Sequence, residues 1–581
     1  MSANESLEML GRRLAVARGE APADLVIKNA RLVNVLSGEI HEADVAVAEG
    51  VFVGFAGGEA KHVIDAAGAY LCPGFIDGHI HIESTLLSPP VFARAVAPHG
   101  TCAVISDPHE IANVLGLPGI EYMLACSQDL PVTCYFMAPS CVPATDMATS
   151  GARLGAMDVA ALLARHPERI LGLAEVMNFP GVVAGDETML RKLLAAKGRV
   201  IDGHAPGLTG RALDAYVAAG PQSDHECTEF AEAKEKLRRG LHIMIRQGST
   251  EKNLDTLIDL VTADNWSQFS LVSDDRDPTD LSREGHMNAL VRQAVARGVP
   301  PVRAVAMASL NTARYFGLRR RGAVAPGYRA DAVLVEDLTS FAIREVVLDG
   351  KRLADWEFAD RSCLTPPRAM RVGGEVSEAR LAVPAISQRM RVIGVIPGQI
   401  VTENLEMAPT VRDGLAVADA GRDLAKLAVI ERHKATGNLA LGFVKGLGLK
   451  NGAIAGTVAH DAHNLIVAGT NDADMVLAAR TLMVSGGGFA VASGGQVLAQ
   501  LRLPVAGLMS DAPLEVILDG LAKLDAAFRQ VADLPAEVEA HPFMTMSFLS
   551  LEVIPSLKLT DKGLVDVTAF APVPLFMGNP V

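Results

Sequence analysis

The sequence of 581 residues has few aromatic side chains and little positive charge. Phe, Trp and Tyr make up 4% of the chain, so few rings are present on which nucleic-acid bases could stack. Its 53 Lys and Arg are outnumbered by 67 Asp and Glu, which gives a formal net charge of −14. Because nucleic-acid binding requires a basic surface, we expect no nucleic acid among the partners.

Paired cysteines and long apolar runs are also missing. None of the seven cysteines stands in a CxxC pair, so neither a zinc ribbon nor a disulfide framework is indicated. No uncharged apolar run reaches the ~18–20 residues that a membrane span requires, and the charged N-terminal residues do not resemble a signal peptide. We therefore expect a cytoplasmic protein with reduced thiols and no membrane partner.

Strand-like segments flank a long central region. Residues 24–56 and 322–355 both alternate apolar and polar positions between turns that contain Gly, which is the pattern of short strands. The two segments could fold together into one small β-sandwich domain, made from 1–70 and 320–375. Two unrelated β units are the alternative.

The central region, 71–319, alternates eight short apolar runs with amphipathic helical stretches. Eight β/α repeats in about 250 residues predict a (β/α)8 barrel of the TIM type, in which the chemistry lies at the C-terminal ends of the strands. Many of the eight runs end in polar residues. A doubly wound open sheet is the competing fold, but no GxGxxG turn supports it.

The pattern changes after Pro366 and Pro367. Residues 380–581 mix strand-like and helical segments, and they predict a separate C-terminal α/β or α+β domain. Its glycine clusters at 486–488 and 493–496 read as turns rather than phosphate loops, because no GK[ST] follows.

Histidines and carboxylates follow several of the central runs. His79 and His81 stand two positions apart after one apolar run, so on a strand both imidazoles face the same side. His with Asp or Glu suits Zn, Fe or Mn, and the carboxylates favour a divalent pair over a single structural zinc. The other potential ligands are Glu175, His204, His225 and Asp274.

These motifs resemble the amidohydrolase superfamily and, within it, the adenine deaminase family. The similar stretches in the centre are GHIHIEST at 78–85, SDPHEIANVLG at 106–116, AEVMNFPGV at 174–182, IDGHAPGL at 201–208, SDHECT at 223–228 and SDD at 273–275. The C-terminal stretches VAHDAHN at 458–464 and 542–567 are similar as well. The resemblance covers nearly the whole chain.

The resemblance implies a centre of two divalent metal ions, with Mn or Fe expected first and Zn as the alternative. Many relatives carry a carboxylated lysine where this chain has Glu175, and the glutamate would supply the same anionic bridge. The implied ligands are His79, His81 and Asp274 for one metal, His204 and His225 for the other, and Glu175 for both.

The implied reaction is hydrolytic deamination of adenine to hypoxanthine and ammonia. Two metals ~3.5–4 Å apart can share a hydroxide, and metal binding lowers the pKa of water to around 7. This nucleophile would attack C6 of the purine, with Asp274 as general acid and base. His109 and Glu110 would contact the purine or deliver a proton to N1, although a loop salt bridge with a helix cap at Asp107 is the alternative.

Five residues are expected to contact the substrate. Gln247 departs from the family pattern, which usually has a glutamate there, and Asp275 is either a neighbour of the ligand Asp274 or the ligand itself. His463 lies in an HDAHN turn that could close over the site, bind a further metal, or be only a hydrogen-bonded turn. The expected substrate-binding residues are Asp107, Arg246, Gln247, Asp275 and His463.

Two other functions stay open at this point. A related amidohydrolase could act on another purine or on a cyclic amide. A catalytically silent barrel could serve as an assembly protein, but such a protein should have lost metal ligands, and all six are present here. We also expect a homodimer or a higher homo-oligomer.

Overall fold

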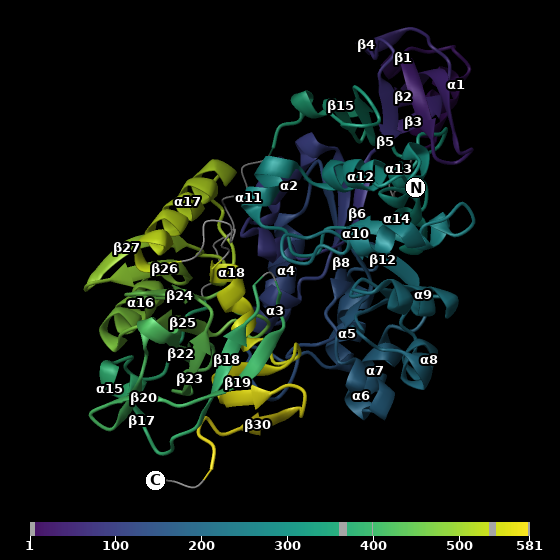
Figure 1. The fold of residues 1–581 in the computed structure, drawn as a ribbon. Coiled ribbons are helices and arrows are strands. Elements are labelled where there is room, and N and C mark those ends of the chain that lie inside the picture. Colours follow the sequence, from purple (N-terminus) through teal and green to yellow (C-terminus); the bar gives the residue numbers. More distant parts are fainter. Residues whose placement is uncertain (1–5, 359–368, 398, 534–541, 579–581) are drawn as a thin grey trace.

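The computed structural model describes residues 6–358, 369–397, 399–533 and 542–578. Cys363, Pro366 and Pro367 lie outside these residues. The six described cysteines are all buried, and none of them forms a disulfide. Figure 1 shows three regions in chain order: a small sheet (purple), a barrel (blue to teal) and a C-terminal region (green to yellow).

The small sheet draws strands from both flanks of the barrel. β14 pairs antiparallel with β5, and this pairing joins the two flanks. All eight strands form one hydrogen-bonded sheet rather than two separate sheets, because β1 pairs with β4 at one end and with β5 at the other. The strands are β1 (Ala23–Asn34), β2 (Glu39–Ala48), β3 (Val51–Gly54), β4 (Ala60–Asp65), β5 (Tyr70–Pro73), β14 (Ala332–Val335), β15 (Ile343–Leu348) and β16 (Lys351–Arg352).

The eight central runs form eight parallel strands. Hydrogen bonds order them as β10-β9-β8-β7-β6 and as β11-β12-β13. They are β6 (Phe75–Ile80), β7 (Thr101–Ser106), β8 (Thr133–Ala138), β9 (Ile170–Val176), β10 (Val200–Gly203), β11 (Ser223–Asp224), β12 (His242–Arg246) and β13 (Phe269–Val272).

Two contacts close these strands into a barrel. The backbone N–H of Asp274 donates to the carbonyl of His79 at 2.9 Å, which joins the end of β13 to β6. At the other seam, between β10 and β11, the backbone N–H of Gln222 donates to the carbonyl of Ile201 at 2.9 Å. A Cβ at Gly203 would lie 2.1 Å from the carbonyl oxygen of Ser223, so glycine is needed for this close approach. The closed ring excludes the open doubly wound sheet.

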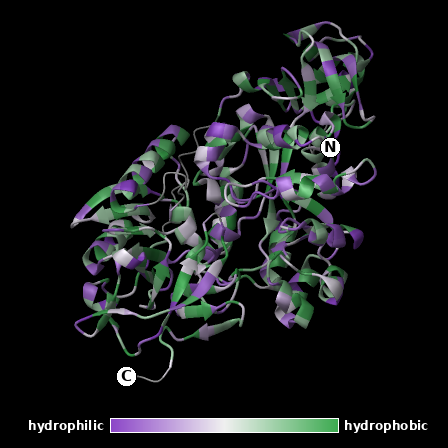
Figure 2. Cartoon of the chain, viewed as in Figure 1, coloured by the Kyte–Doolittle hydropathy of each residue, from purple (hydrophilic) through white to green (hydrophobic). Residues whose placement is uncertain are grey.

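Helices surround the strands of the barrel. Barrel strands such as β6 and β7 are buried along their whole length, as expected for parallel strands covered by helices, and Figure 2 shows mixed colouring on the surrounding helices. The main helices are α2 (Pro89–Val96), α3 (His109–Leu115), α4 (Leu117–Cys126), α5 (Ala156–Arg165), α6 (Phe179–Ala184), α7 (Glu187–Ala195), α8 (Gly210–Ala219), α9 (Phe230–Arg238), α10 (Leu254–Leu257), α11 (Pro278–Glu284), α12 (Met287–Ala296), α13 (Pro301–Met307) and α14 (Leu310–Tyr315).

The C-terminal region is built on an eight-stranded sheet. All its neighbouring strands pair antiparallel except β18 and β23, so the region is α+β rather than an alternating α/β fold. Helices α16 (Asp472–Ser485), α17 (Leu514–Val531) and α18 (Pro542–Ser547) accompany it. In order, the strands are β19 (Thr402–Met407), β18 (Met390–Val395), β23 (Leu439–Lys445), β22 (Leu424–Ile430), β25 (Leu465–Gly469), β24 (Ala453–Gly456), β26 (Gly488–Ser493) and β27 (Gln496–Arg502).

The C-terminal region contacts the loops at the mouth of the barrel. Ser510 exchanges backbone hydrogen bonds of 2.8 and 2.9 Å with Leu86 and Ser88, which follow β6. Beyond β8, the backbone N–H of Thr149 donates to Asp561 at 2.7 Å. Among the described residues, no helix combines the length and apolar character needed to cross a membrane.

Candidate metal centre

The end of β6 aims two imidazoles at the centre of the barrel mouth. His79 and His81 are both buried, and their rings lie 4.9 Å apart. Nδ1 of His81 lies 3.1 Å from the carbonyl oxygen of Asp107, which can only accept, so Nδ1 carries the proton. The other ring nitrogen, Nε2, faces inward, where it lies 3.1 Å from Asp274 and 3.3 Å from Glu175.

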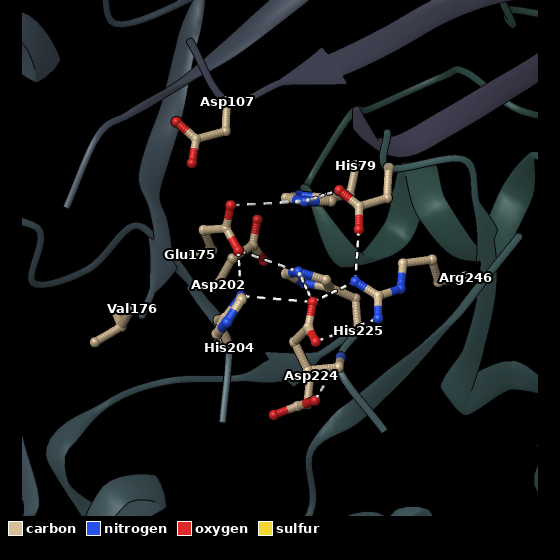
Figure 3. A network of polar contacts seen from close by, with 12 residues as sticks. His79, Asp107, Glu175, Val176, Asp202, His204, Asp224, His225 and Arg246 are labelled. Carbon is tan, nitrogen blue, oxygen red and sulfur yellow. Dashed lines mark hydrogen bonds and ion pairs between the residues drawn. The ribbon is translucent and has the colours of Figure 1, made fainter. Parts of the chain in front are cut away.

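Glu175, near the end of β9, lies at the middle of this cluster (Figure 3). Its Oε2 is 2.5 Å from Nδ1 of His204 and 3.1 Å from Nε2 of His225, and its Oε1 faces His81. Burial opposes ionisation of Glu175, but the charges and hydrogen bonds of the surrounding histidines outweigh it and hold its pKa well below the usual value. A buried carboxylate with three imidazoles around it can interact with a positive charge at each of its two oxygens.

Asp274 follows β13 and completes the ring of carboxylates and histidines. Its backbone has φ 57°, a left-handed conformation that Asp tolerates better than most residues. Its Oδ1 lies 3.5 Å from Nε2 of His79, and its Oδ2 accepts a hydrogen bond of 2.7 Å from Arg246. Burial opposes the ionisation of Asp274, but Arg246 and the two histidines lower its pKa well below the usual value.

The donor atoms fit a divalent metal centre. In two groups of residues, all the possible ligand atoms lie within 4.8 Å of one another. One group is His79, His81 and Asp274, and the other is His79, Glu175 and His225. Nε2 of His79 is buried without a hydrogen-bond partner among the described residues, and it lies 3.5 Å from Asp274 and 4.0 Å from Glu175. An unpartnered imidazole nitrogen between carboxylates is what a bound cation would satisfy.

A second line of polar residues leads away from this cluster. Nδ1 of His109 donates to Asp107 at 3.0 Å and lies 3.5 Å from Glu175, while its Nε2 lies 3.5 Å from Glu110. Burial lowers the pKa of His109, but the charges of Asp107 and Glu110 outweigh it and raise the pKa well above the usual value. His109 therefore links the central Glu175 to Glu110.

Glu110 is held from the other side by the C-terminal region. Nδ1 of His460 donates to it at 2.6 Å, and Nε2 of His463 donates to its other oxygen. Nδ1 of His463 accepts a hydrogen bond of 3.1 Å from the backbone N–H of Ala459, so Nε2 must carry the proton and has no lone pair for a metal. The geometry thus favours a hydrogen-bonded clamp on Glu110 over the further metal site that the turn could also have formed.

The two clamping histidines differ in charge. Burial lowers the pKa of His460, but the neighbouring Glu110 outweighs it and raises the pKa to about 9. Burial dominates at His463 and lowers its pKa to about 4. At neutral pH the carboxylate of Glu110 therefore lies between a cationic and a neutral imidazole.

A small cavity of about 50 Å³ opens at the centre and shows where the sequence-based expectations differ from the structure. Gln247 turns away from it, since its side chain accepts from the backbone of Leu254. His463 lies behind Glu110, and His460 takes the place on the wall that we expected for His463. The expected residues that do line the cavity are His81, His109, Glu110, Glu175, His204, His225, Arg246, Asp274 and Asp275.

Arg246 lines the cavity but is already engaged by carboxylates. Besides Asp274, its guanidinium makes a two-pronged ion pair with Glu226, whose second prong measures 3.2 Å. Glu226 also lies 3.5 Å from Nε2 of His225. Glu226 was not among the expected site residues, although its place directly after His225 at a strand end was a usable signal. Glu251 in the lining was not expected either, whereas Asp461 belongs to the HDAHN turn that the sequence indicated as a possible cover of the site.

A buried lysine fixes the loops that carry two of the histidines. Nζ of Lys236 donates to the carbonyl of Ala205 at 2.6 Å and lies 3.1 Å from Asp224 and 2.6 Å from Glu232. Asp224 in turn accepts from the backbone N–H groups of Ala205 and Glu226. These contacts brace the chain on either side of His204 and His225.

Comparisons with known proteins agree with this architecture. Residues 70–353 match the amidohydrolase family, and residues 399–571 match the adenine deaminase C-terminal domain. The first match gives the class of the barrel and its site, that of the amidohydrolases.

Curated relatives give the narrower family. A protein named adenine deaminase from Oleidesulfovibrio alaskensis is 56% identical over 97% of this chain and 98% of its own length. Adenine deaminase of Desulfatibacillum aliphaticivorans is 48% identical over 97% of this chain and 99% of its own. Adenine deaminase 2 of Carboxydothermus hydrogenoformans is 48% identical over 96% and 98%. The chain belongs to the adenine deaminase family of amidohydrolases.

Proposed function

We propose that this protein hydrolyses adenine to hypoxanthine and ammonia. The observation that carries the proposal is the convergence of three histidines on the carboxylate of Glu175 at the mouth of a closed barrel. Relatives named adenine deaminase, which match nearly the whole chain, support the same substrate. No observation favours another purine or a cyclic amide.

We propose two divalent metal ions as the cofactor, manganese or iron first and zinc as the alternative. Imidazole and carboxylate donors of this kind accept all three metals. When bound, the pair would supply an activated water molecule as nucleophile. The residues proposed to hold them are His79, His81, Glu175, His204, His225 and Asp274, with Glu175 between the two ions.

The chain's own acids and bases would move the protons of the reaction. Asp274 lines the cavity, and Arg246 fixes one of its oxygens, so the other can accept the proton of the attacking water and pass it on. His109 and Glu110 lie together on the cavity wall, in position to serve the ring nitrogen N1. Asp107 orients His109 through a 3.0 Å hydrogen bond.

The remaining substrate contacts are assigned by their place on the wall. Asp275 and His460 line the cavity and are proposed to contact the purine edge. We propose that Arg246 positions Asp274 and Glu226 rather than binding substrate directly. The domain boundaries, the cytoplasmic location, the absence of a nucleic-acid partner and the homo-oligomeric state stay predictions from the sequence.

A turnover assay on a small panel tests the proposal. The protein, supplied with manganese, is offered adenine, cytosine and the cyclic amide hydantoin. Ammonia release is measured for the two bases, and loss of substrate is measured for all three, because ring opening of hydantoin releases no ammonia. We expect adenine to be turned over far better than the other two. Hydrolysis of hydantoin with no reaction on adenine would replace the proposal by the cyclic-amide alternative.

Metal analysis separates an enzyme from a silent assembly barrel. An enzyme of this type should bind about two transition-metal ions per chain, as a two-metal hydrolase does. An assembly protein should purify without them and release no ammonia from any member of the panel.

A further inference from the structure

A second and larger cavity lies next to the metal centre. Its volume is about 460 Å³, within the usual range of small-molecule sites, whereas the cavity at the metal centre measures about 50 Å³. Three residues, Asp275, His460 and Phe548, line both cavities. The larger space therefore adjoins the reacting groups directly.

Elements of the barrel and of the C-terminal region form its walls. α11, which follows the strand end carrying Asp274, lies beside α17 (Figure 1). Leu518, Leu521, Ala522 and Asp525 of α17 line the cavity at helical spacings of three and four, so one face of this helix borders it. The cavity thus depends on both regions of the chain.

Aromatic rings are concentrated at the inner part of this wall. Phe548 stacks on His460 with ring centroids 4.7 Å apart and an angle of 11° between the planes. Phe489 and Phe543 form a second pair, 4.8 Å apart. In a chain with few aromatic residues, this supply of flat apolar surface suits a planar heteroaromatic ligand.

The charges of the wall argue against a phosphorylated ligand. Three carboxylates line the cavity against two guanidiniums and the cationic imidazole of His460, and Arg529 is already paired with Asp525 at 2.9 Å. A phosphate would therefore meet no excess of positive charge. A neutral base can instead donate its ring N–H to Asp275, which lies where the two cavities meet.

We propose that this cavity is a vestibule that binds the neutral purine base beside the metal centre, adenine on its way in and hypoxanthine on its way out. The proposal rests on the proposed function and extends it, since it assigns the C-terminal region a role in selecting a free base over a nucleotide.

Filling the vestibule tests it. Ala522→Trp puts a large ring into the cavity, and Ala526→Trp is the matched control, because Ala526 is an exposed alanine of the same helix outside the lining. We expect Ala522→Trp to lower kcat/KM for adenine by about tenfold or more, with metal content and Tm unchanged, and Ala526→Trp to match the wild type. Equal kcat/KM in both variants would overturn the vestibule.

A second measurement needs no bulky residue during folding. Ala522→Cys and Ala526→Cys are labelled with a maleimide after purification, with the wild type as background, since the six described native cysteines are buried. Hypoxanthine should slow labelling at position 522 and leave position 526 unaffected. Unchanged labelling at 522 would contradict the proposal. Adenine turnover by the unmodified wild type in the same assay separates this failure from failure of the proposed function.

Discussion

The carboxylate of Glu110 lies 2.6 Å from Nδ1 of His460, although the two residues are 350 positions apart in the chain. Glu110 belongs to the barrel and stands beside His109 on the wall of the metal centre, whereas His460 and His463 come from the C-terminal region. The barrel supplies all the proposed metal ligands, but the position of Glu110 depends on both regions. The C-terminal region is therefore part of the active site as we propose it.

Removing the second clamping histidine should impair turnover without loss of metal. We expect His463→Ala to lower kcat/KM for adenine by about tenfold or more, or about 1.4 kcal/mol of transition-state stabilisation, because Glu110 loses a hydrogen-bond donor. His463→Gln keeps an N–H that can donate and should retain most of the activity. Kinetics and metal content are measured on the same preparations, and normal kcat/KM in His463→Ala would remove the clamp from catalysis.

Neutralising Glu175 should empty the metal centre. We expect Glu175→Gln to lose most of the bound metal and nearly all activity, because a neutral amide does not offset two divalent charges. Glu552→Gln is a suitable control, since Glu552 is a buried carboxyl group that accepts a hydrogen bond from Thr145 and takes no part in the proposed metal centre. Metal analysis of both variants decides the matter, and full occupancy with normal turnover in Glu175→Gln would refute its role.

Removing the buried Lys236 should destabilise the fold. Lys236→Met leaves Asp224 and Glu232 without their shared cation, and breaking a buried ion pair in this way costs roughly 3–5 kcal/mol. Lys234→Met changes an exposed lysine of the same helix and should alter the free energy of unfolding by less than about 0.5 kcal/mol. Chemical denaturation compares the two, and equal stabilities would show that Lys236 does not brace these loops.

The buried Lys558 should give stability a pH dependence of defined sign. Burial lowers its pKa to about 7, whereas an unfolded lysine titrates near 10.4, so the unfolded chain binds more protons between these values. Stability should therefore rise with pH across this interval, by up to about 1.4 kcal/mol per pH unit. Lys558→Met should lack this increment.

Urea denaturation from about pH 7 to about pH 9 measures that difference. Lys562→Met, which replaces a nearby exposed lysine, should keep the wild-type pH dependence. If the wild type and Lys558→Met change in parallel with pH, Lys558 has no lowered pKa in the folded protein. Nζ of Lys558 donates to the carbonyls of Ile400 and Phe548, which line the cavity at the metal centre. The comparison therefore also probes contacts that support the wall of this cavity.

Most of the barrel and its ring of histidines could be predicted from the sequence. Each apolar run maps onto a strand, and a closed parallel barrel brings all strand ends to one mouth, so His79, Glu175 and His225 must approach one another. This inference needs only local patterns and one rule of topology.

Contacts between distant segments could not be predicted in the same way. Nothing local to Glu110 indicates that His460 and His463 will reach it, because their approach depends on how the barrel and the C-terminal region pack against each other. The side chain of Gln247 turns to the start of α10, where the backbone N–H of Leu254, unpaired within the helix, donates to its Oε1. The small region was expected to be a β-sandwich, and its strands form one hydrogen-bonded sheet. That sheet exists because β1 pairs with β4 along its first half and with β5 along its second half, which no local pattern indicates.

The most direct test of the account is a paired measurement of metal content and product formation on the wild-type protein. We predict about two transition-metal ions per chain and equal amounts of hypoxanthine and ammonia from adenine, with turnover lost on chelation and restored by manganese or iron. Adenine turnover that persists in protein stripped of metal, or protein with both metals bound that leaves adenine unchanged, would contradict it.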